Sequence, residues 1–263
     1  MTESIRPHER IPKNNYLGKH LEINDIFESP AHLFIPTETY PQDSVCLLIH
    51  FHGSHEVADY AIKNKNGWAA LTLNLGSGSS AYSRPLDQVD AFHKLLKATE
   101  STMRKPIKAI YLSGWSAGYG AIRSILKSNY YSQIDGVLLL DGMHAGYIPK
   151  GQPLATGAKI NEEDLSIFLQ LAQDAIKGNI IFTFTHSSVF PGTFASTTEC
   201  ADYLINQLEL KRNPVLIQGP LGMQQVADNQ EGSLRIKAYA GNSAPDHVDH
   251  LHALSWFLEE MTH

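Results

Sequence analysis

The fold is decided by residues 107–128, which read IKAIYLSGWSAGYGAIRSILKS. The run Ile107–Leu112 is mostly apolar and predicts a buried strand, and the residues that follow Gly118 predict a helix. Between them, Gly-Trp-Ser-Ala-Gly at 114–118 has the spacing of a tight turn between strand and helix. In such a turn the side chain of Ser116 is lifted above the sheet, with the helix N-terminus beneath it. Ser116 is therefore the first candidate for a reactive residue.

Outward from this turn, short apolar runs alternate with stretches of helical pattern. This alternation favours the α/β class, with a mostly parallel sheet and helices on both faces. The strongest run, Val45–Phe51, is apolar on both faces, as expected of a covered strand. The other predicted strands are His32–Pro36, Trp68–Leu75, Ile107–Leu112, Ile134–Leu140, Ile180–Thr185 and Leu234–Tyr239, with a short extra strand or hairpin within Asn213–Gln230.

Helices are predicted between these strands, where apolar residues recur with the helical period of 3.6 residues. Residues 76–85 are rich in Gly and Ser and predict a loop. Asn161 is a candidate N-cap, and Gly178 a candidate residue to end a helix. The helices are expected at His55–Lys65, Leu86–Arg104, 119–128, Glu162–Lys177, Thr198–Leu210 and Pro245–Met261.

Bulk properties limit the classes of function. We expect a single domain over residues 1–263, with a small lid-like insertion at about 142–178. A net charge of −6 provides no basic surface for nucleic acid, and no stretch has the apolar length of a membrane span. Two cysteines make no disulfide framework and favour a reducing compartment. With a polar N-terminal stretch that lacks a signal pattern, these features predict a cytoplasmic protein.

A serine that attacks a carbonyl group needs hydrogen-bond donors for the oxygen that becomes negative. One donor is expected to be the N–H of Ala117, which directly follows the serine. The second is expected in the loop after an earlier strand, here His52-Gly53-Ser54 after Val45–Phe51. The N–H of Ser54 is the first choice, and that of Gly53 is the next.

Residues 31–260 resemble the α/β-hydrolase superfamily. The resemblance rests on HLFIP, a turn, VCLLIHFHG, then GWSAG, and a late histidine after the last strand. Within the superfamily the chain is similar to esterase-like members with a short lid. The resemblance implies a three-layer fold with a mostly parallel sheet of about eight strands. It also implies a Ser…Asp/Glu…His order of site residues and no metal or organic cofactor.

The resemblance places the general base after the last strand. The segment there contains three histidines, His247, His250 and His252. His247 is favoured because it falls in the first turn of the predicted helix, near the strand end; His250 remains the alternative. His252 is expected deeper in the helix, in a structural or exposed position. The His-x-x-His-x-His spacing lacks the Glu of a helical zinc motif, so we expect no metal site.

The acid that orients the base is harder to place. The resemblance usually puts it after the strand predicted at Ile180–Thr185, but no carboxylate follows that strand before Glu199. The alternative position is the end of the preceding strand, where Asp141 stands beside a glycine. Asp141 is favoured, and Glu199 and Asp249 remain alternatives.

These residues predict a hydrolase for a small carboxylic ester or thioester, with a covalent acyl-enzyme on Ser116. An acyltransferase with the same triad is one alternative, and a non-catalytic binding protein of the same fold is another. The sequence does not indicate an oligomeric state. Residues expected near the substrate are His52, Trp115 and His144, with Tyr82, His186, Ser187 and Ser188 as further loop or strand-end candidates.

Overall fold

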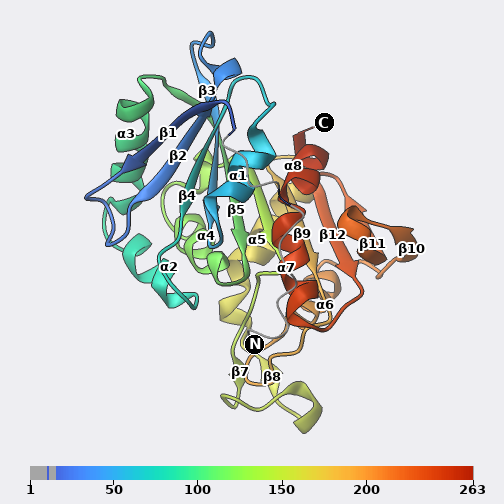
Figure 1. Ribbon diagram of the computed structural model, residues 1–263. Helices are drawn as coiled ribbons and strands as arrows, with labels where there is room; N and C mark the ends of the chain where they lie inside the picture. Colours follow the sequence, from blue (N-terminus) through green and yellow to red (C-terminus); the bar gives the residue numbers. More distant parts are fainter. Residues whose placement is uncertain (1–10, 12–15, 263) are drawn as a thin grey trace. The chain divides into compact units, whose positions relative to one another are not determined.

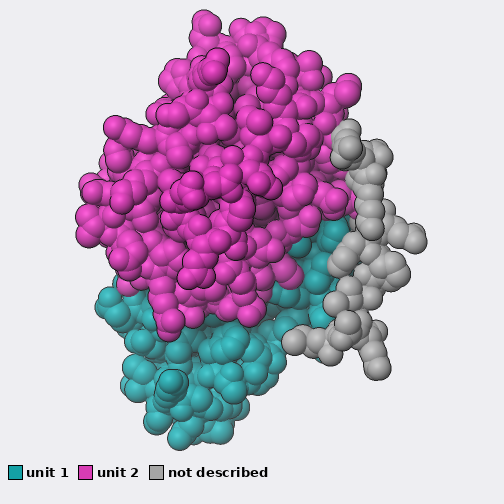
Figure 2. Space-filling view, turned by 60° about the vertical axis from the view of Figure 1, so that its left-hand side comes forward, with its two compact units in different colours: residues 1–8, 139–253 teal, residues 9–138, 254–263 magenta. Residues whose placement is uncertain are grey.

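The computed structural model describes residue 11 and residues 16–262 (Figure 1). The described chain forms two compact units, which Figure 2 colours separately. Among the described residues, the larger unit comprises residues 11, 16–138 and 254–262, and the smaller unit comprises residues 139–253. No helix within the described residues combines the length and apolarity that crossing a membrane requires.

Parallel strands form the centre of the larger unit. β3 pairs in parallel with β4 on one side and β5 on the other, whereas β2 pairs antiparallel with β4 and with β1. Nearly every residue of β3 and β4 is buried, which explains why their sequences are apolar on both faces. The strands, in spatial order, are β1 (Gly18–Ile23), β2 (Ala31–Pro36), β4 (Trp68–Leu73), β3 (Val45–Phe51), β5 (Ile107–Trp115) and the start of β6 (Gly136–Leu140).

Two groups of helices pack in the larger unit. α1 contacts β4 and α8, whereas α2 contacts α4 and α3. These helices are α1 (His55–Ile62), α2 (Ser80–Leu86), α3 (Ala91–Met103), α4 (Tyr119–Leu126) and α8 (Leu254–Thr262). Short 3₁₀ turns cover Thr37–Thr39, Ser116–Gly118 and Tyr131–Gln133.

The smaller unit continues from the end of β6. β9 pairs in parallel with β12, and β10, β11 and β12 follow one another in antiparallel pairs. Its strands are β6, β9 (Ile181–His186), β12 (Leu234–Tyr239), β11 (Gln224–Glu231) and β10 (Pro214–Gln218), with a separate pair β7 (Tyr147–Ile148) and β8 (Lys159–Ile160). Its helices are α5 (Ser166–Ile176), α6 (Thr197–Gln207) and α7 (Ala244–His252), with 3₁₀ turns at Leu154–Thr156, Glu162–Asp164 and Pro220–Gly222.

Several predicted helix boundaries were wrong. The loop predicted at 76–85 contains most of α2, and the helix predicted at Leu86–Arg104 begins only at Ala91. The left-handed backbone of Asp90, with φ 61°, separates α2 from α3. The single helix predicted at Pro245–Met261 is two helices, because Ala253 ends α7.

The predicted helix caps had mixed outcomes. Asn161 precedes the 3₁₀ turn Glu162–Asp164 and makes no capping hydrogen bond, so that prediction was wrong. Gly178 has φ 78° and directly follows the C-cap residue of α5, Lys177, as predicted.

The turn between β5 and α4 is tight because two glycines allow close backbone contacts. A Cβ atom on Gly118 would lie 2.1 Å from the carbonyl oxygen of Phe51 at the end of β3. A Cβ atom on Gly114 would lie 2.9 Å from the side chain of Ile122 on α4. Ser116, between them, has φ 46°, a conformation that is costly for a residue with a side chain. The glycines therefore let the turn Ser116–Gly118 approach the end of β3 and let α4 pack against β5.

We predict that Gly118→Ala destabilises the protein by more than about 2 kcal/mol, because the new methyl group meets backbone that cannot move aside. Gly146→Ala is the control, since its Cβ atom would meet nothing closer than 3.4 Å. Urea unfolding followed by circular dichroism measures both variants. Equal midpoints for the two variants would contradict the close approach described here.

Candidate active site

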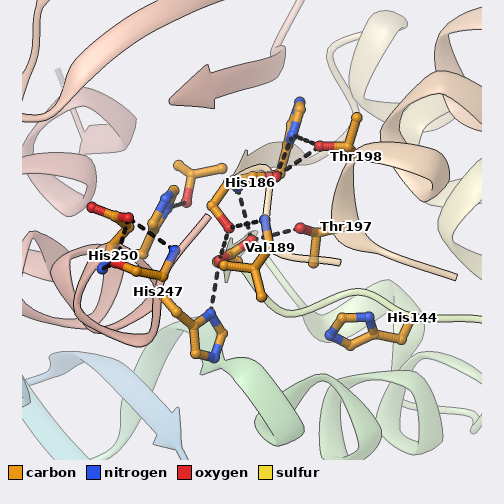
Figure 3. A network of polar contacts seen from close by, with 12 residues as sticks. His144, His186, Val189, Thr197, Thr198, His247 and His250 are labelled. Carbon is orange, nitrogen blue, oxygen red and sulfur yellow. Dashed lines mark hydrogen bonds and ion pairs between the residues drawn. The ribbon is translucent and has the colours of Figure 1, made fainter. Parts of the chain in front are cut away.

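Two of the residues singled out in the sequence meet in the smaller unit. The Nδ1 atom of His247, on the first turns of α7, lies 2.7 Å from Oδ2 of Asp141, which follows β6 (Figure 3). Only 1% of Asp141 is exposed, whereas 22% of the His247 side chain is exposed. A carboxylate accepts hydrogen bonds, so Nδ1 carries the proton in this pair. In the neutral ring, Nε2 then carries the lone pair that a general base requires.

Three further hydrogen bonds hold the Asp141 carboxylate. The backbone N–H of Ser187 donates to Oδ1 at 2.9 Å, and the Ser187 hydroxyl donates to Oδ2 at 2.6 Å. The Thr197 hydroxyl donates to Oδ1 at 2.6 Å. The Asp141 N–H in turn donates to the carbonyl of Thr185 at 2.8 Å, which joins the residue to β9. Both carboxylate oxygens therefore have at least two donors.

These contacts outweigh the cost of burying a charge. Burial by itself would raise the pKa of Asp141, but the neighbouring His250 and His247 and the hydrogen bonds from His247 and Ser187 favour the ionised form. The net effect holds the pKa of the Asp141 carboxyl far below its usual range. At neutral pH the site therefore contains a buried negative charge with one partly exposed histidine against it.

The alternative base has a different environment. His250 is 1% exposed, and its Nδ1 lies 2.7 Å from the hydroxyl of Thr185 on β9. Its ring meets Tyr239 edge-on at 5.4 Å between centroids. Burial lowers the pKa of His250, which opposes protonation of the ring. His252 is also buried rather than exposed.

The alternative acids are also placed elsewhere. The Oε2 atom of Glu199 accepts hydrogen bonds from the N–H and hydroxyl of Ser196 and from the hydroxyl of Tyr147. Glu199 thus completes the capping box at the start of α6. Asp249 is buried on α7. Of the three carboxylates considered from the sequence, Asp141 is the one that the structure pairs with His247.

Other predicted residues of the smaller unit lie in the surrounding loops. The Nδ1 atom of His144 donates to the carbonyl of Ala195 at 2.9 Å, and its ring meets Phe194 edge-on. Burial lowers the pKa of His144. His186 contacts the hydroxyl of Thr198 through Nδ1 at 3.0 Å, and burial lowers its pKa to about 3. Each of these two rings therefore has a hydrogen-bond partner; Figure 3 labels both histidines.

The Ser116 turn belongs to the larger unit. Ser116 is partly exposed and directly follows β5. Phe51, the last residue of β3, is in register with Gly114 of β5, so the loops after these two parallel strands leave the same edge of the sheet. Gly53 in the loop after β3 has φ 121°. Ser54 is the N-cap of α1, where its hydroxyl accepts from the N–H of Glu56.

A ring cluster fixes the loop after β3. The imidazole of His52 stacks on Trp115, with 5.0 Å between centroids and 10° between planes. Its Nδ1 lies 2.7 Å from the hydroxyl of Tyr82, which itself donates to Asn74. The tyrosine hydroxyl therefore accepts from the His52 ring, and burial raises the pKa of Tyr82 to about 12. The backbone of His52 has φ 71°, so these contacts stabilise a strained residue.

The sequence matches no protein-family model and no curated protein. Its structure resembles a poly(3-hydroxybutyrate) depolymerase from Bordetella parapertussis, 12% identical over 92% of this chain and 90% of the other, with a TM-score of 0.51. An esterase from Rhizomucor miehei is 12% identical over 98% and 87%, with a TM-score of 0.52. Est1E from Butyrivibrio proteoclasticus is 13% identical over 93% and 98%, with a TM-score of 0.50.

The chain has the α/β-hydrolase fold. This confirms the fold class expected from the sequence. Identities near 12% are too low to transfer an activity, so the function of this protein has to be argued from its own site residues.

The sequence analysis did not identify Ser187 and Thr197 as hydrogen-bond donors to Asp141. Ser187 was noted only as a residue at a strand end, and its position directly after β9 is a usable signal. Thr197 was not considered, because the first residue of a helix has no feature that identifies it as a partner of a distant aspartate. Both donate a hydroxyl hydrogen bond to Asp141.

We predict that Thr197→Val lowers the free energy of unfolding by about 1–3 kcal/mol, because Asp141 then loses a donor inside the protein. Thr183→Val is the matched control. Thr183 on β9 is equally buried, and its hydroxyl has no hydrogen-bond partner among the described residues. Its replacement should be neutral or slightly stabilising. Denaturant titration of both variants gives the comparison, and equal losses would contradict the role of Thr197.

The lowered pKa of Asp141 predicts an effect of pH on stability. A carboxyl with a lower pKa in the folded state stabilises above its unfolded pKa of about 3.9, and this contribution disappears as pH falls toward the folded value. Asp141→Asn should therefore be less stable at neutral pH and lose less stability between about pH 5 and 2. Asp87→Asn, at an exposed residue of the larger unit, is the control. Parallel curves for wild type and Asp141→Asn would contradict this assignment.

Proposed function

We propose that this α/β hydrolase cleaves a small carboxylic ester or thioester through a covalent acyl-enzyme on Ser116. The observation that carries the proposal is the 2.7 Å hydrogen bond between His247 and the buried Asp141 carboxylate. An imidazole oriented by an enclosed carboxylate is the acid–base half of a Ser-His-Asp triad. The esterases with the same fold add support at the level of reaction class.

In the proposed reaction, a proton passes between the Ser116 hydroxyl and the ring of His247. Nε2 of His247 takes the proton of the Ser116 hydroxyl as Oγ bonds to the carbonyl carbon of the ester. The carbonyl oxygen becomes negative in the tetrahedral intermediate. When the intermediate collapses, the bond to the leaving group breaks and His247 donates its proton to that group. Water then attacks the acyl-enzyme while His247 takes a proton from it. The bond to Ser116 breaks, His247 returns the proton to the serine oxygen, and the carboxylic acid is released.

Asp141 stabilises the imidazolium that forms during each proton transfer. Its hydrogen bond holds Nδ1–H in place, so that Nε2 is the nitrogen left for the serine. Its lowered pKa keeps the carboxylate ionised at the pH where the neutral imidazole acts as a base.

The proposed oxyanion hole uses the N–H groups of Ala117 and Ser54, with Gly53 as the alternative to Ser54. Support comes from the adjacent ends of β3 and β5 and from the short loop that connects β3 to α1. Fixed backbone donors are effective because they need no reorganisation as charge develops. We also place His52, Trp115 and His144 at the substrate, where the stacked rings of His52 and Trp115 offer a flat apolar surface.

The organisation and location of the enzyme are part of the same proposal. We assign residues 1–263 to one catalytic domain, with the segment 142–178 as its small lid. A reducing compartment such as the cytoplasm is favoured because both Cys46 and Cys200 are free thiols. The partner is a small acyl substrate.

A fluorophosphonate probe tests the nucleophile, because it forms a covalent bond only with an activated serine. We predict that wild type is labelled and that Ser116→Ala is not. The same substitution should reduce p-nitrophenyl ester hydrolysis by about 10⁴-fold or more. Ser128→Ala, at an exposed residue just after α4, should behave as wild type. Labelling that persists in Ser116→Ala would exclude Ser116 as the nucleophile.

The choice of base is tested with the same substrate. His247→Ala should abolish turnover, whereas His250→Gln should retain most of it once both variants are shown to be folded by circular dichroism. Loss of turnover in His250→Gln alone would assign the base to His250 instead.

A further inference from the structure

A second cluster of ionisable side chains lies in the larger unit, within β1, β2 and α1. The Nδ1 atom of His20 lies 3.3 Å from Nε2 of His32, and these nitrogens lie 3.6 Å and 3.2 Å from Oδ2 of Asp59. None of the three residues belongs to the proposed ester-cleaving site. We propose that His20, His32 and Asp59 bind one transition-metal cation, with Zn²⁺ as the best match.

The spacing of the three atoms fits a single cation. Zinc bonds to imidazole nitrogen and carboxylate oxygen at about 2.0–2.2 Å, so two ligands of a tetrahedral site stand about 3.3–3.6 Å apart. The three measured separations, 3.2, 3.3 and 3.6 Å, lie close to this range. The three atoms therefore form one face of a tetrahedron of the right size.

The hydrogen bonds of His20 determine which nitrogen faces the cluster as a ligand. Nε2 of His20 lies 3.2 Å from the carbonyl oxygen of Tyr16. A carbonyl oxygen only accepts, so Nε2 carries the proton and Nδ1 of the neutral ring presents its lone pair. That lone pair points into a group containing a carboxylate oxygen, an arrangement that a cation between them stabilises. Metal-bound histidines commonly donate their other N–H to a carbonyl in this way.

Asp59 provides an independent indication of a cation. It is 1% exposed, and its Oδ1 atom has no hydrogen-bond partner among the described residues. Within the described part of the chain its carboxylate forms ion pairs with histidines, and these all use Oδ2. A buried carboxylate without a permanently charged partner is costly, whereas a divalent cation would neutralise it.

His55 supports the arrangement from one turn before Asp59 on α1. Its Nδ1 lies 3.0 Å from Oδ2 of Asp59, and its ring stacks on His32 with 3.8 Å between centroids. His55 therefore holds both the carboxylate and the His32 ring in the orientation that the cation requires.

The ligand types select the kind of metal. Two imidazoles and one carboxylate suit Zn²⁺ and its neighbours in the first transition row, whereas Mg²⁺ and Ca²⁺ prefer oxygen ligands alone. His20 is 32% exposed, so water can reach the fourth position. The cation would connect two strands to α1, and because such a site is absent from the unfolded chain, its binding would stabilise the fold.

Titration of the metal-stripped, untagged protein with Zn²⁺ in a calorimeter tests the proposal. Wild type should bind Zn²⁺ at this site, and its melting temperature should rise. His20→Gln should weaken binding by ~10-fold or more, and His32→Gln should do the same. His93→Gln is the matched control, because His93 lies on α3 and belongs to no part of the cluster. It should bind as wild type does.

Co²⁺ provides a second readout that separates this site from loose binding to other histidines. Four-coordinate Co²⁺ gives intense visible absorption, which should appear in wild type and His93→Gln and be lost in His20→Gln. Mg²⁺ should give no rise in melting temperature. The proposal is wrong if wild type takes up no Zn²⁺, or if His20→Gln binds Zn²⁺ and Co²⁺ as wild type does. His20 is partly exposed, so this variant should fold even if the one at His32 does not.

Discussion

A carboxylate with almost no contact with solvent lies at the end of β6, and much of the smaller unit is arranged around its charge. Ser187 from the end of β9, Thr197 from the start of α6 and His247 from α7 all donate hydrogen bonds to Asp141. An ionised group in this position would be strongly destabilising without these donors. The relative placement of β9, α6 and α7 thus depends on a single side chain. The same carboxylate also sets the orientation of the His247 ring.

Much of the fold could be predicted because its strands carry a strong local signal. β3 and β6 are buried on both faces, so their sequences are continuous apolar runs. β1 was missed because it is short, largely exposed and alternates without a clear pattern. α2 was missed because Ser, Arg and Pro in its sequence suggest a loop, and its helical form depends on packing against α4 and α3.

The site residues show the same division between local and distant signals. Asp141 could be proposed because a carboxylate at the end of a buried strand is unusual. The sequence could not separate His247 from His250, because their different environments arise from Asp141 just after β6 and from Thr185 on β9. The cluster of His20, His32 and Asp59 had no sequence signal at all. Its members stand 12 and 27 residues apart, and only the pairing of β1 with β2 and the packing of α1 bring them together.

The position of Asp141 directly after β6 has a consequence for how this protein can diverge. The loop from Ser187 to Ser196 touches the carboxylate only near its ends, through Ser187 and through Thr197 just beyond it. The intervening residues include the exposed aromatics Phe190 and Phe194 and contain neither member of the Asp141–His247 pair. Mutations can accumulate in this stretch, and its length can change, while the pair stays intact. New surface chemistry can therefore arise in this segment while the hydrogen bond between Asp141 and His247 is kept.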